Sequence, residues 1–340
     1  MIMITDEYNL RYYTGFRGGE GIAFTFPDGE NYLIVDSRYT EAAKQESDFT
    51  VIEYNKQNPL KDIIKDIVLK RNVTEVAFED KSIVYADLMH YKGFFDKSIN
   101  FVPLGDALLK KRQVKNSYEI EMLAEAEAIG DRAFNDILGI IRPGLTEKEL
   151  AAELEYRMKK HGAEGFSFDT ICASGLNSSM PHAIPGDKLL ENGDFVTMDF
   201  GCIYKGYCSD MTRTVVLGKA SDEQRKVYEI VFEAQLAGLN AVKAGMRCCD
   251  VDKVARDVIS SYGYGEYFGH GLGHSVGLYI HESPSLNTRD ETVLVPNMIE
   301  TVEPGVYIPG FGGVRIEDMV VVTEDGCRNL ANSPKNLIEI

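Results

Sequence analysis

The segment Val196-Thr-Met-Asp-Phe-Gly-Cys-Ile-Tyr-Lys-Gly-Tyr-Cys-Ser-Asp-Met-Thr-Arg-Thr-Val-Val216 indicates two antiparallel strands joined by a turn at residues 204–206. With the turn centred between residues 204 and 205, pairing places Asp199 directly opposite Asp210. Cβ atoms of opposed residues lie about 5 Å apart, and like charges there destabilise a strand pair. A hairpin that keeps two carboxylates face to face therefore predicts a cation between them. The alternative is that one aspartate is a turn or surface residue.

A second segment, residues 301–318, has the same design. Its turn, Pro309-Gly310-Phe311-Gly312, makes residue 310 the midpoint, and Glu303 and Glu317 are equidistant from it. A second hairpin is thus predicted to oppose two carboxylates. Because the glutamate pair repeats the aspartate pair, coincidence is a poor explanation for either.

A glycine-rich segment, residues 268–281, contains three of the six histidines: His270, His274 and His281. Glycine lets the backbone approach a ligand closely, and histidine is the commonest nitrogen ligand of metals. His182, in the loop segment 175–182, is a fourth candidate, although it could be only a polar loop residue. The residues alone predict that one histidine of the glycine-rich segment is a ligand, without deciding which.

Four carboxylates with one or more imidazoles make an oxygen-rich site. Such a site suits manganese or cobalt better than a structural zinc site would, although zinc is possible. Four negative charges exceed what one divalent ion neutralises. We therefore expect two divalent metal ions, with manganese as the first choice, about 3.5–4 Å apart and bridged by carboxylates, which is a hydrolytic arrangement.

The pattern along the chain predicts two domains. Residues 1–105 alternate strand-like runs (21–26, 32–35 and 73–78) with amphipathic helical runs (39–46 and 60–70), which is typical of an α/β layer. Residues 106–116 are predicted to be a linker and contain the basic stretch Lys110-Lys-Arg-Gln-Val-Lys115.

Residues 117–340 are predicted to form the second domain. A helix starts at residue 116 or 117, capping boxes at Thr146 with Glu149 and at Ser221 with Gln224 start two more, and a fourth spans 250–262. Strand-rich segments follow each helix pair. The order predicts a duplicated unit.

The composition limits the partners and the location. The chain has 340 residues and a net charge of −17, and nucleic acid or an anionic membrane would require a basic surface. No run approaches the roughly 20 apolar residues of a membrane span, and no secretory signal is visible. We therefore expect a cytoplasmic protein without nucleic-acid or membrane partners. The six cysteines have no disulfide or metal-ligand spacing and are expected to be reduced.

With these segments in place, the chain resembles the pita-bread metallopeptidases, in their aminopeptidase P and prolidase branch. The motifs MDFG, SDMTRT, HGLGHSVGLYIHE, VEPGVYIP and VRIED occur in the order and spacing of that family, and Tyr13-Thr-Gly-Phe16 is similar to its creatinase-type N-terminal domain. The resemblance implies an α/β (α+β) protein: a creatinase-like domain followed by a catalytic domain with pseudo-twofold duplicated helices and a curved antiparallel sheet. Family members usually begin with a helix and strand ahead of the segment at Asn9, where this chain has only residues 1–5, so we expect either that the chain is trimmed or that its start has been placed too late.

The resemblance also implies roles. Asp199 would chelate one metal, Asp210 and Glu317 would bridge both, and His274 and Glu303 would complete the shell of the other. Glu303 would in addition exchange the proton of the bridging water.

Three further residues have roles in the family. His182 and His281 match histidines that contact the substrate, and Arg315 matches an arginine that holds the carboxylates in place. His270 is similar to a residue behind the ligands and is not expected to bind metal.

The expected activity is that of an Xaa-Pro aminopeptidase, with an Xaa-Pro dipeptidase (prolidase) as the alternative. The aminopeptidase is preferred slightly because no residue that would hold a dipeptide carboxylate can be identified; Arg289 is near the right region in sequence but cannot be placed. A non-catalytic binding protein or a metal-free creatinase-like hydrolase is disfavoured because all five ligands are present. The resemblance further implies a proline-containing peptide as substrate and a homodimer.

Overall fold

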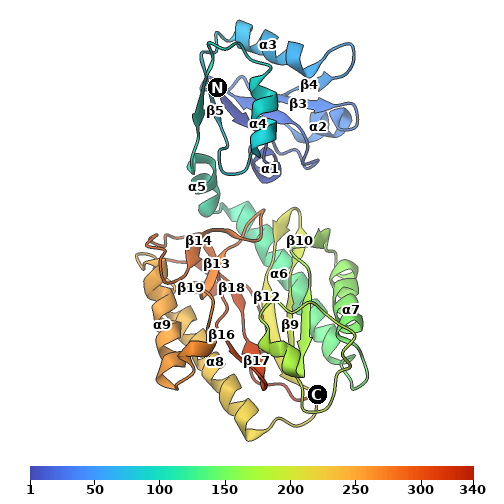
Figure 1. Cartoon of the computed structure of the whole chain (residues 1–340), viewed down its shortest axis with the longest axis vertical. Coiled ribbons are helices and arrows are strands. Elements are labelled where there is room, and N and C mark those ends of the chain that lie inside the picture. The colour runs from blue at the N-terminus through green and yellow to red at the C-terminus, as the bar shows by residue number, and fades with distance from the viewer. The chain divides into compact units, whose positions relative to one another are not determined.

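In the computed structural model, which describes residues 1–340, the chain divides between Lys111 and Arg112 into two units. The first unit contains a six-stranded mixed sheet in the order β4-β3-β2-β1-β5-β6 (Figure 1). Its strands are β1 (Ile2–Ile4), β2 (Ile22–Thr25), β3 (Tyr32–Asp36), β4 (Thr50–Tyr54), β5 (Glu75–Phe78) and β6 (Asn100–Pro103). Its helices are α1 (Glu7–Thr14), α2 (Thr40–Glu46), α3 (Leu60–Lys70), α4 (Tyr85–Lys92) and α5 (Ala107–Gln113), the last of which runs across the division.

Apolar residues on both faces of this sheet explain why helices cover it on both sides. Along β3, Tyr32 and Ile34 pack with α3, whereas Leu33 and Val35 pack with residues of α1 and α2. Alternate residues of a strand point to opposite faces, so a continuous apolar run favours a strand that is buried twice. The predicted α/β layer, with its three strands and two helices, is confirmed.

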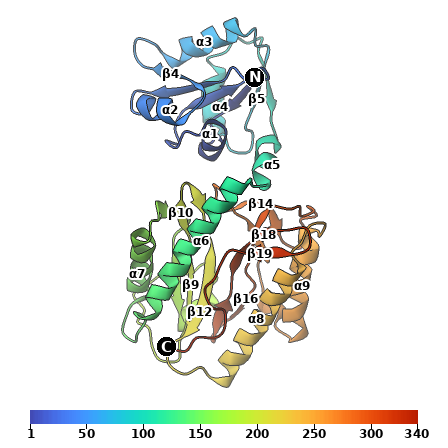
Figure 2. The same cartoon turned by 180° about the vertical axis from the view of Figure 1, so that it is seen from behind.

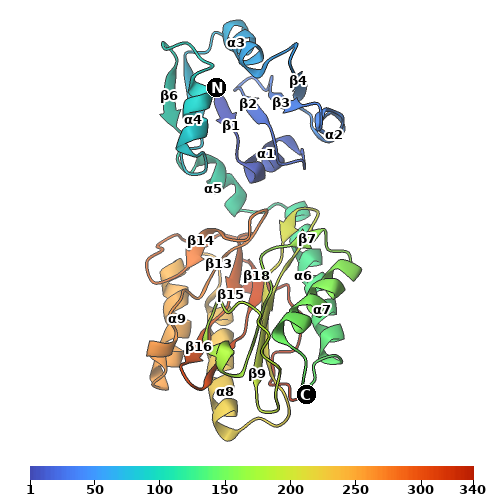
Figure 3. The same ribbon diagram turned by 45° about the vertical axis from the view of Figure 1, so that its right-hand side comes forward.

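The second unit contains two pairs of long helices and curved antiparallel sheets. The helices are α6 (Ser117–Leu138), α7 (Glu147–Lys160), α8 (Asp222–Ala241) and α9 (Cys248–Ser261). Figure 2 shows α6 and α8 crossing in front of the strands, and Figure 3 shows α6 and α7 on one side of the unit and α8 and α9 on the other. The capping boxes predicted at Thr146 and Ser221 are confirmed, and Asn116 caps α6 in a further complete capping box that we did not predict.

The strands of this unit form a three-stranded sheet β12-β9-β8, a five-stranded sheet β14-β13-β15-β18-β19, and two smaller sheets, β11-β10-β7 and β16-β17. Their bounds are β7 (Gly165–Phe166), β8 (Ile171–Ser174), β9 (Phe195–Phe200), β10 (Cys202–Tyr204), β11 (Tyr207–Cys208), β12 (Met211–Val216), β13 (Gly273–Ser275), β14 (Glu282–Leu286), β15 (Ile299–Val302), β16 (Gly305–Ile308), β17 (Gly312–Arg315), β18 (Asp318–Val322) and β19 (Cys327–Asn329). Two short 3₁₀ helices, η1 (Gly175–Ser179) and η2 (Gly265–Tyr267), complete it.

Each helix pair packs on its own strands. One core joins α6 and α7 to β9 and β12, and a second core joins α8 and α9 to β15, β16, β17 and β18. Two equivalent layers of helices and strands are what the predicted duplication requires. The predicted fold class is therefore confirmed.

The register of the first hairpin corrects the predicted one. Asp199 pairs with Thr212, and Tyr204 pairs with Tyr207, so the turn is centred between Lys205 and Gly206. Both turn residues have positive φ, at 49° and 81°, as a two-residue turn of the primed type requires. The carboxylates are therefore diagonal neighbours on one face rather than directly opposed.

The second hairpin agrees with its predicted midpoint. Gly305 pairs with Arg315 in β16–β17, and Val302 pairs with Asp318 in β15–β18. Both ladders are symmetric about residue 310, so Glu303 and Glu317 occupy matching positions between them. No helix is both long and apolar enough to cross a membrane, and none of the six cysteines forms a disulfide bond.

Candidate metal centre

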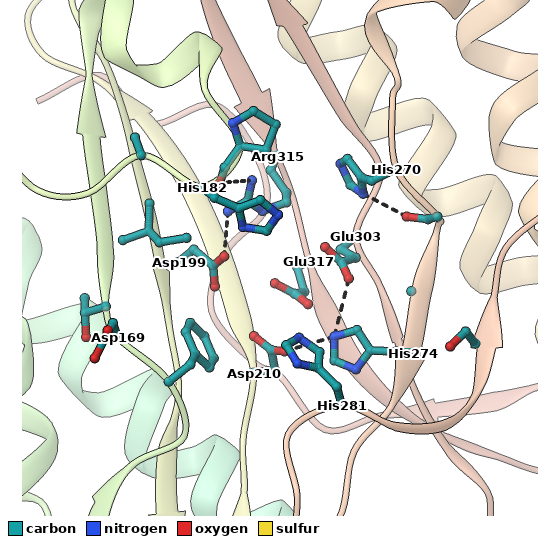
Figure 4. Close-up of a pocket in the computed structure, with 18 of the residues that line it drawn as sticks. Asp169, His182, Asp199, Asp210, His270, His274, His281, Glu303, Arg315 and Glu317 are labelled. Atoms are coloured by element: carbon teal, nitrogen blue, oxygen red, sulfur yellow. Dashed lines mark hydrogen bonds and ion pairs between the residues drawn. The ribbon is translucent and has the colours of Figure 1, made fainter. Parts of the chain in front are cut away.

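The acidic residues face the interior of the second unit because their neighbours in sequence pack on the helices. On β9, Val196, Met198 and Phe200 belong to the core under α6 and α7, so Asp199 points to the opposite face. On the other side of the unit, Val314 and Ile316 belong to the core under α8 and α9. The alternation turns Arg315 and Glu317 in the same way toward the centre (Figure 4).

The predicted ligands come together at this centre. One ligand atom each of Asp210, His274 and Glu317 lie within 4.8 Å of one another. The Nε2 atom of His274 is 3.5 Å from Oδ2 of Asp210 and 3.6 Å from Oε1 of Glu303. Figure 4 shows Asp199 on the side of Glu317 that lies toward Arg315. Five residues that are separated by up to 118 positions thus form one cluster.

The His274 ring has the tautomer that a metal ligand needs. Its Nδ1 atom lies 3.1 Å from the carbonyl oxygen of Ser275, which can only accept, so Nδ1 carries the proton. Burial, and next the His281 ring, lower the pKa of His274 to about 4. The neutral ring therefore presents an unprotonated Nε2 to the carboxylates.

Burial and mutual repulsion disfavour the ionised carboxylates when no cation is bound. Burial, and next the charges of Glu317 and Asp199, raise the pKa of Asp210 well above its usual value. Burial, and next Glu303, raise that of Glu317. Burial raises the pKa of Glu303 to about 8, although Arg315 opposes the rise. Cations between these groups would remove the repulsion.

The donor set fits divalent metal ions. Besides the unprotonated Nε2 of His274, the Oδ1 atom of Asp199 is buried without any hydrogen-bond partner. A buried oxygen without a partner is rare unless an ion or a water satisfies it. Four carboxylates and one imidazole are also the donor types that manganese, cobalt and zinc accept.

Arg315 organises the carboxylates from behind. Its Nη2 atom donates to Oδ2 of Asp199 at 2.6 Å and its Nε atom donates to the Thr212 hydroxyl at 3.0 Å. The Thr212 hydroxyl in turn donates to Oε2 of Glu317 at 2.7 Å. The Nη1 atom of Arg315 donates to the hydroxyl of Tyr307 at 2.7 Å. One guanidinium thus fixes carboxylates from both halves of the unit.

His270 lies behind this network. Its Nδ1 atom donates to the carbonyl of Gly271, and its Nε2 atom lies 3.0 Å from the Tyr307 hydroxyl. Because that hydroxyl accepts from Arg315, it donates to Nε2, and both ring nitrogens of His270 are engaged. Burial, and next Arg315, lower its pKa to about 4. The ring therefore has no free nitrogen for a metal.

Thr212 and Tyr307 are the residues of this network that we did not predict. Thr212 is two residues after Asp210 and pairs with Asp199, so a period of two would have placed it on the same face. Tyr307 lies in the second hairpin without any comparable signal. Its phenol is recognisable only once the fold brings it to Arg315.

A cavity of about 740 Å³ opens onto the carboxylates. His182 and His281 line it, and the rings of His274 and His281 are 4.6 Å apart, edge to face. Arg289, which the sequence could not place, also lines it. The Arg289 side chain forms neither an ion pair nor a hydrogen bond within the chain. The hydrogen bond of this residue is donated by its backbone nitrogen to the Asn287 side chain.

Comparison with known proteins agrees with this geometry. The model of metallopeptidase family M24 matches residues 121–324, and that of the creatinase/prolidase N-terminal domain matches residues 1–114. The chain belongs to metallopeptidase family M24. The suspected resemblance is thereby confirmed, and the M24 membership makes the protein a metal-dependent hydrolase.

Full-length relatives of this M24 peptidase include an Xaa-Pro dipeptidase from Pyrococcus furiosus, 39% identical over 99% of this chain and 94% of the relative. Among solved structures, an Xaa-Pro dipeptidase from Bacillus anthracis has a TM-score of 0.96 and 43% identity, covering 100% of this chain and 94% of that one. An X-Pro aminopeptidase from Thermotoga maritima has a TM-score of 0.95 and 40% identity, covering 100% and 97%.

Proposed function

We propose that the protein hydrolyses the bond between an N-terminal residue and proline, with Xaa-Pro dipeptides as its main substrates. The observation that carries the choice of dipeptides is Arg289 in the wall of the cavity that holds the carboxylate cluster. Our slight preference for an aminopeptidase depended on finding no basic residue there. A guanidinium without a partner in the chain suits the free carboxylate of a dipeptide.

Metal ions bound at this centre would activate a water molecule for attack on the carbonyl. We propose that Asp199, Asp210, His274, Glu303 and Glu317 hold two such ions, and the oxygen-rich donor set supports manganese as the first candidate. Each of these residues contributes to the cluster described above.

The side chains of the cavity would handle the proton and the substrate. Glu303, whose Oε1 atom lies 3.6 Å from Nε2 of His274 in the cluster, is suited to accept a proton from the attacking water and deliver it to the imide nitrogen of proline. His182 and His281 lie in the wall, where an imidazole N–H can stabilise the negative charge that develops on the carbonyl oxygen. Arg315 would keep Asp199 and Glu317 in place.

A second candidate is the Xaa-Pro aminopeptidase, and the likeness to the structure from Thermotoga maritima favours it. The two activities differ in the length of the substrate. In an aminopeptidase the carboxyl side of proline continues as a peptide, so the cavity must stay open there and needs no cation.

One experiment tests both candidates. The protein is loaded with manganese, cobalt or zinc, its metal content is measured, and release of the free amino acid is followed for Xaa-Pro and Xaa-Pro-Yaa peptides of the same first residue. We expect release from both, with a higher kcat/KM for the dipeptide. A higher value for the tripeptide would favour the aminopeptidase, and no release by protein with bound metal would refute the proposed function. We also propose a homodimer, as the resemblance implies, and light scattering of the same sample tests it.

A further inference from the structure

Three charged side chains form a buried cluster outside the carboxylate centre. Arg112 and Lys115 belong to the basic stretch at residues 110–115, yet their exposed fractions are only 5% and 2%. They meet Glu282, whose side chain is 7% exposed. Lysine and arginine are rarely buried unless they are paired, so this part of the basic stretch is not an ordinary solvated linker.

The Glu282 carboxylate is held on all sides. Its Oε1 atom accepts a charged hydrogen bond from Nη2 of Arg112 and a weaker one, 3.3 Å long, from the backbone nitrogen of Tyr279. Its Oε2 atom lies 3.2 Å from Nζ of Lys115. A Cβ atom on Gly277 would lie 2.5 Å from the carboxylate oxygens, so the chain wraps this group too closely for any other residue. Arg112 and Lys115 hold its pKa below the usual value despite burial, which raises it.

The cluster is attached to His281 directly and to His274 through Ser275. Glu282 directly follows His281. Lys115 also donates to the Ser275 hydroxyl at 3.1 Å, and Ser275 is the residue whose carbonyl accepts from Nδ1 of His274. The ends of the segment 274–282 are therefore both fixed to the residues just before α6.

Lys115 has a second carboxyl group beside it. Glu300 pairs with Ser275 in the β13–β15 ladder and is fully buried, with neither carboxyl oxygen hydrogen-bonded. Burial raises the pKa of Glu300, and Lys115 opposes that rise. Removing the Lys115 ammonium would thus take a neighbouring positive charge away from two buried carboxyl groups, those of Glu282 and Glu300.

We propose that Arg112 and Lys115 are positioning residues, which act through Glu282 to fix His281 in the substrate cavity. Substrate-side groups must be held closely, since a displacement of about 1 Å can cost roughly a hundredfold in rate. The part of this proposal that concerns catalysis rests on the proposed function. The part that concerns the place of the imidazole does not.

A double-mutant cycle tests the catalytic part. Lys115→Met, Glu282→Gln and His281→Ala are compared singly and in the pairs that contain His281→Ala, all with measured metal content and melting temperature. We expect Lys115→Met and Glu282→Gln each to lower kcat on Xaa-Pro by about tenfold or more, but by less than about twofold when His281 is already alanine. Lys115→Arg should recover much of the loss, and Lys110→Met, a matched change at an exposed position of the same stretch, should have no effect. Equal losses in both backgrounds would overturn the proposal.

Histidine-ring NMR spectra of the zinc-loaded protein give a readout that needs no activity. The signals of His281 are assigned from their absence in His281→Ala. We expect them to shift in Lys115→Met and in Glu282→Gln, and to stay in place in Lys110→Met. Unmoved His281 signals in both folded variants would refute the positioning role. If even the unmodified protein cleaves no Xaa-Pro peptide, the proposed function fails, and the spectra still decide whether the cluster positions His281. If one variant does not fold, the other carries the test.

Discussion

Arg315 and Asp199 form a partly buried ion pair in which Nη2 lies 2.6 Å from Oδ2. The two residues come from different halves of the duplicated unit, β17 and β9. The remaining nitrogens of Arg315 contact Thr212 and Tyr307. A planar guanidinium presents donors on three separate nitrogen atoms, whereas the three donors of an ammonium group all lie on one nitrogen and cannot reach the same three positions.

We therefore predict that Arg315→Lys retains the positive charge but loses most of the activity. The expected fall in kcat or in metal affinity is roughly 10- to 100-fold, as for other residues that orient metal ligands. Steady-state kinetics and metal titration of the variant measure both. Arg328→Lys, at an exposed position, is the matched control. Wild-type activity and affinity in Arg315→Lys would contradict the role given to the guanidinium.

The histidines differ in their free nitrogens, and metal content should follow that difference. His274→Ala removes a free Nε2 and should lower the bound metal to fewer than two ions per chain. His270→Ala removes a ring whose nitrogens are both engaged, so the stoichiometry should stay the same. Elemental analysis after dialysis distinguishes the two variants, and equal losses in both would count against our ligand set.

The stability of the metal-free protein should fall with rising pH. The pKa of Glu303 is raised from 4.5 to about 8 in the folded chain, so the folded state holds a proton that the unfolded state releases. Its stabilising effect is complete below pH 4.5 and is lost progressively as the pH rises toward 8. Melting temperatures of chelator-treated protein between pH 5 and 8 check this expectation. This pH range lies between the ordinary pKa of 4.5 and the raised pKa of about 8. Glu303→Gln should reduce the slope of melting temperature against pH. A melting temperature that does not change with pH in the unmodified protein would contradict the raised pKa of Glu303.

Glu147 should matter for catalysis although it lies outside the cavity. It is the first residue of α7, is buried, and accepts hydrogen bonds from the Ser174 nitrogen at 2.7 Å, the Asn177 amide at 3.1 Å and the Gly186 nitrogen at 3.0 Å. These donors flank the loop that carries His182. Glu147→Gln replaces an accepting oxygen by a donating NH₂ group, which cannot satisfy the same partners.

We expect kcat of Glu147→Gln on Xaa-Pro to fall roughly 10- to 100-fold, with metal content unchanged. Glu155→Gln, on the same helix and without a hydrogen-bond partner, serves as the control. Loss of metal from Glu147→Gln would show instead that the damage reaches the ligands.

Arg289 should determine affinity for the substrate carboxylate. Arg289→Met is expected to raise KM for Xaa-Pro by roughly 10- to 100-fold, which corresponds to the loss of a hydrogen bond to a charged group. An Xaa-Pro amide lacks the carboxylate, so its KM should change little. Kinetics on this pair of substrates provides the comparison, and a similar KM change for both would argue against a carboxylate contact.

A residue of this site can be predicted from the sequence only where a local pattern, such as symmetry about a turn, indicates its position. Glu303 and Glu317 are recognisable because both ladders of the second hairpin are symmetric about residue 310. The register of Asp199 was predicted incorrectly because the turn is centred between Lys205 and Gly206. That turn requires a positive φ at Lys205, which a lysine in the sequence does not indicate. A non-glycine residue rarely takes that conformation.

Contacts between distant segments leave no signal of this kind. Arg112 and Glu282 are 170 residues apart, and neither helical nor strand periodicity marks them as partners. The same holds for Tyr307 and His270. Side chains that meet only after the sheets have assembled have to be found in the structure.

The anchoring of Glu282 has a practical consequence for shortened forms of the protein. A fragment that begins at Ser117, where the first long helix starts, would retain every residue of the carboxylate cluster and of the cavity wall. It would nevertheless bury Glu282 without Arg112 or Lys115, and a buried charge that loses its partner costs about 3–5 kcal/mol. Gene truncation or proteolysis at that helix boundary would therefore damage the peptidase from a position outside its active site, whereas a cut before Arg112 would leave this anchor intact.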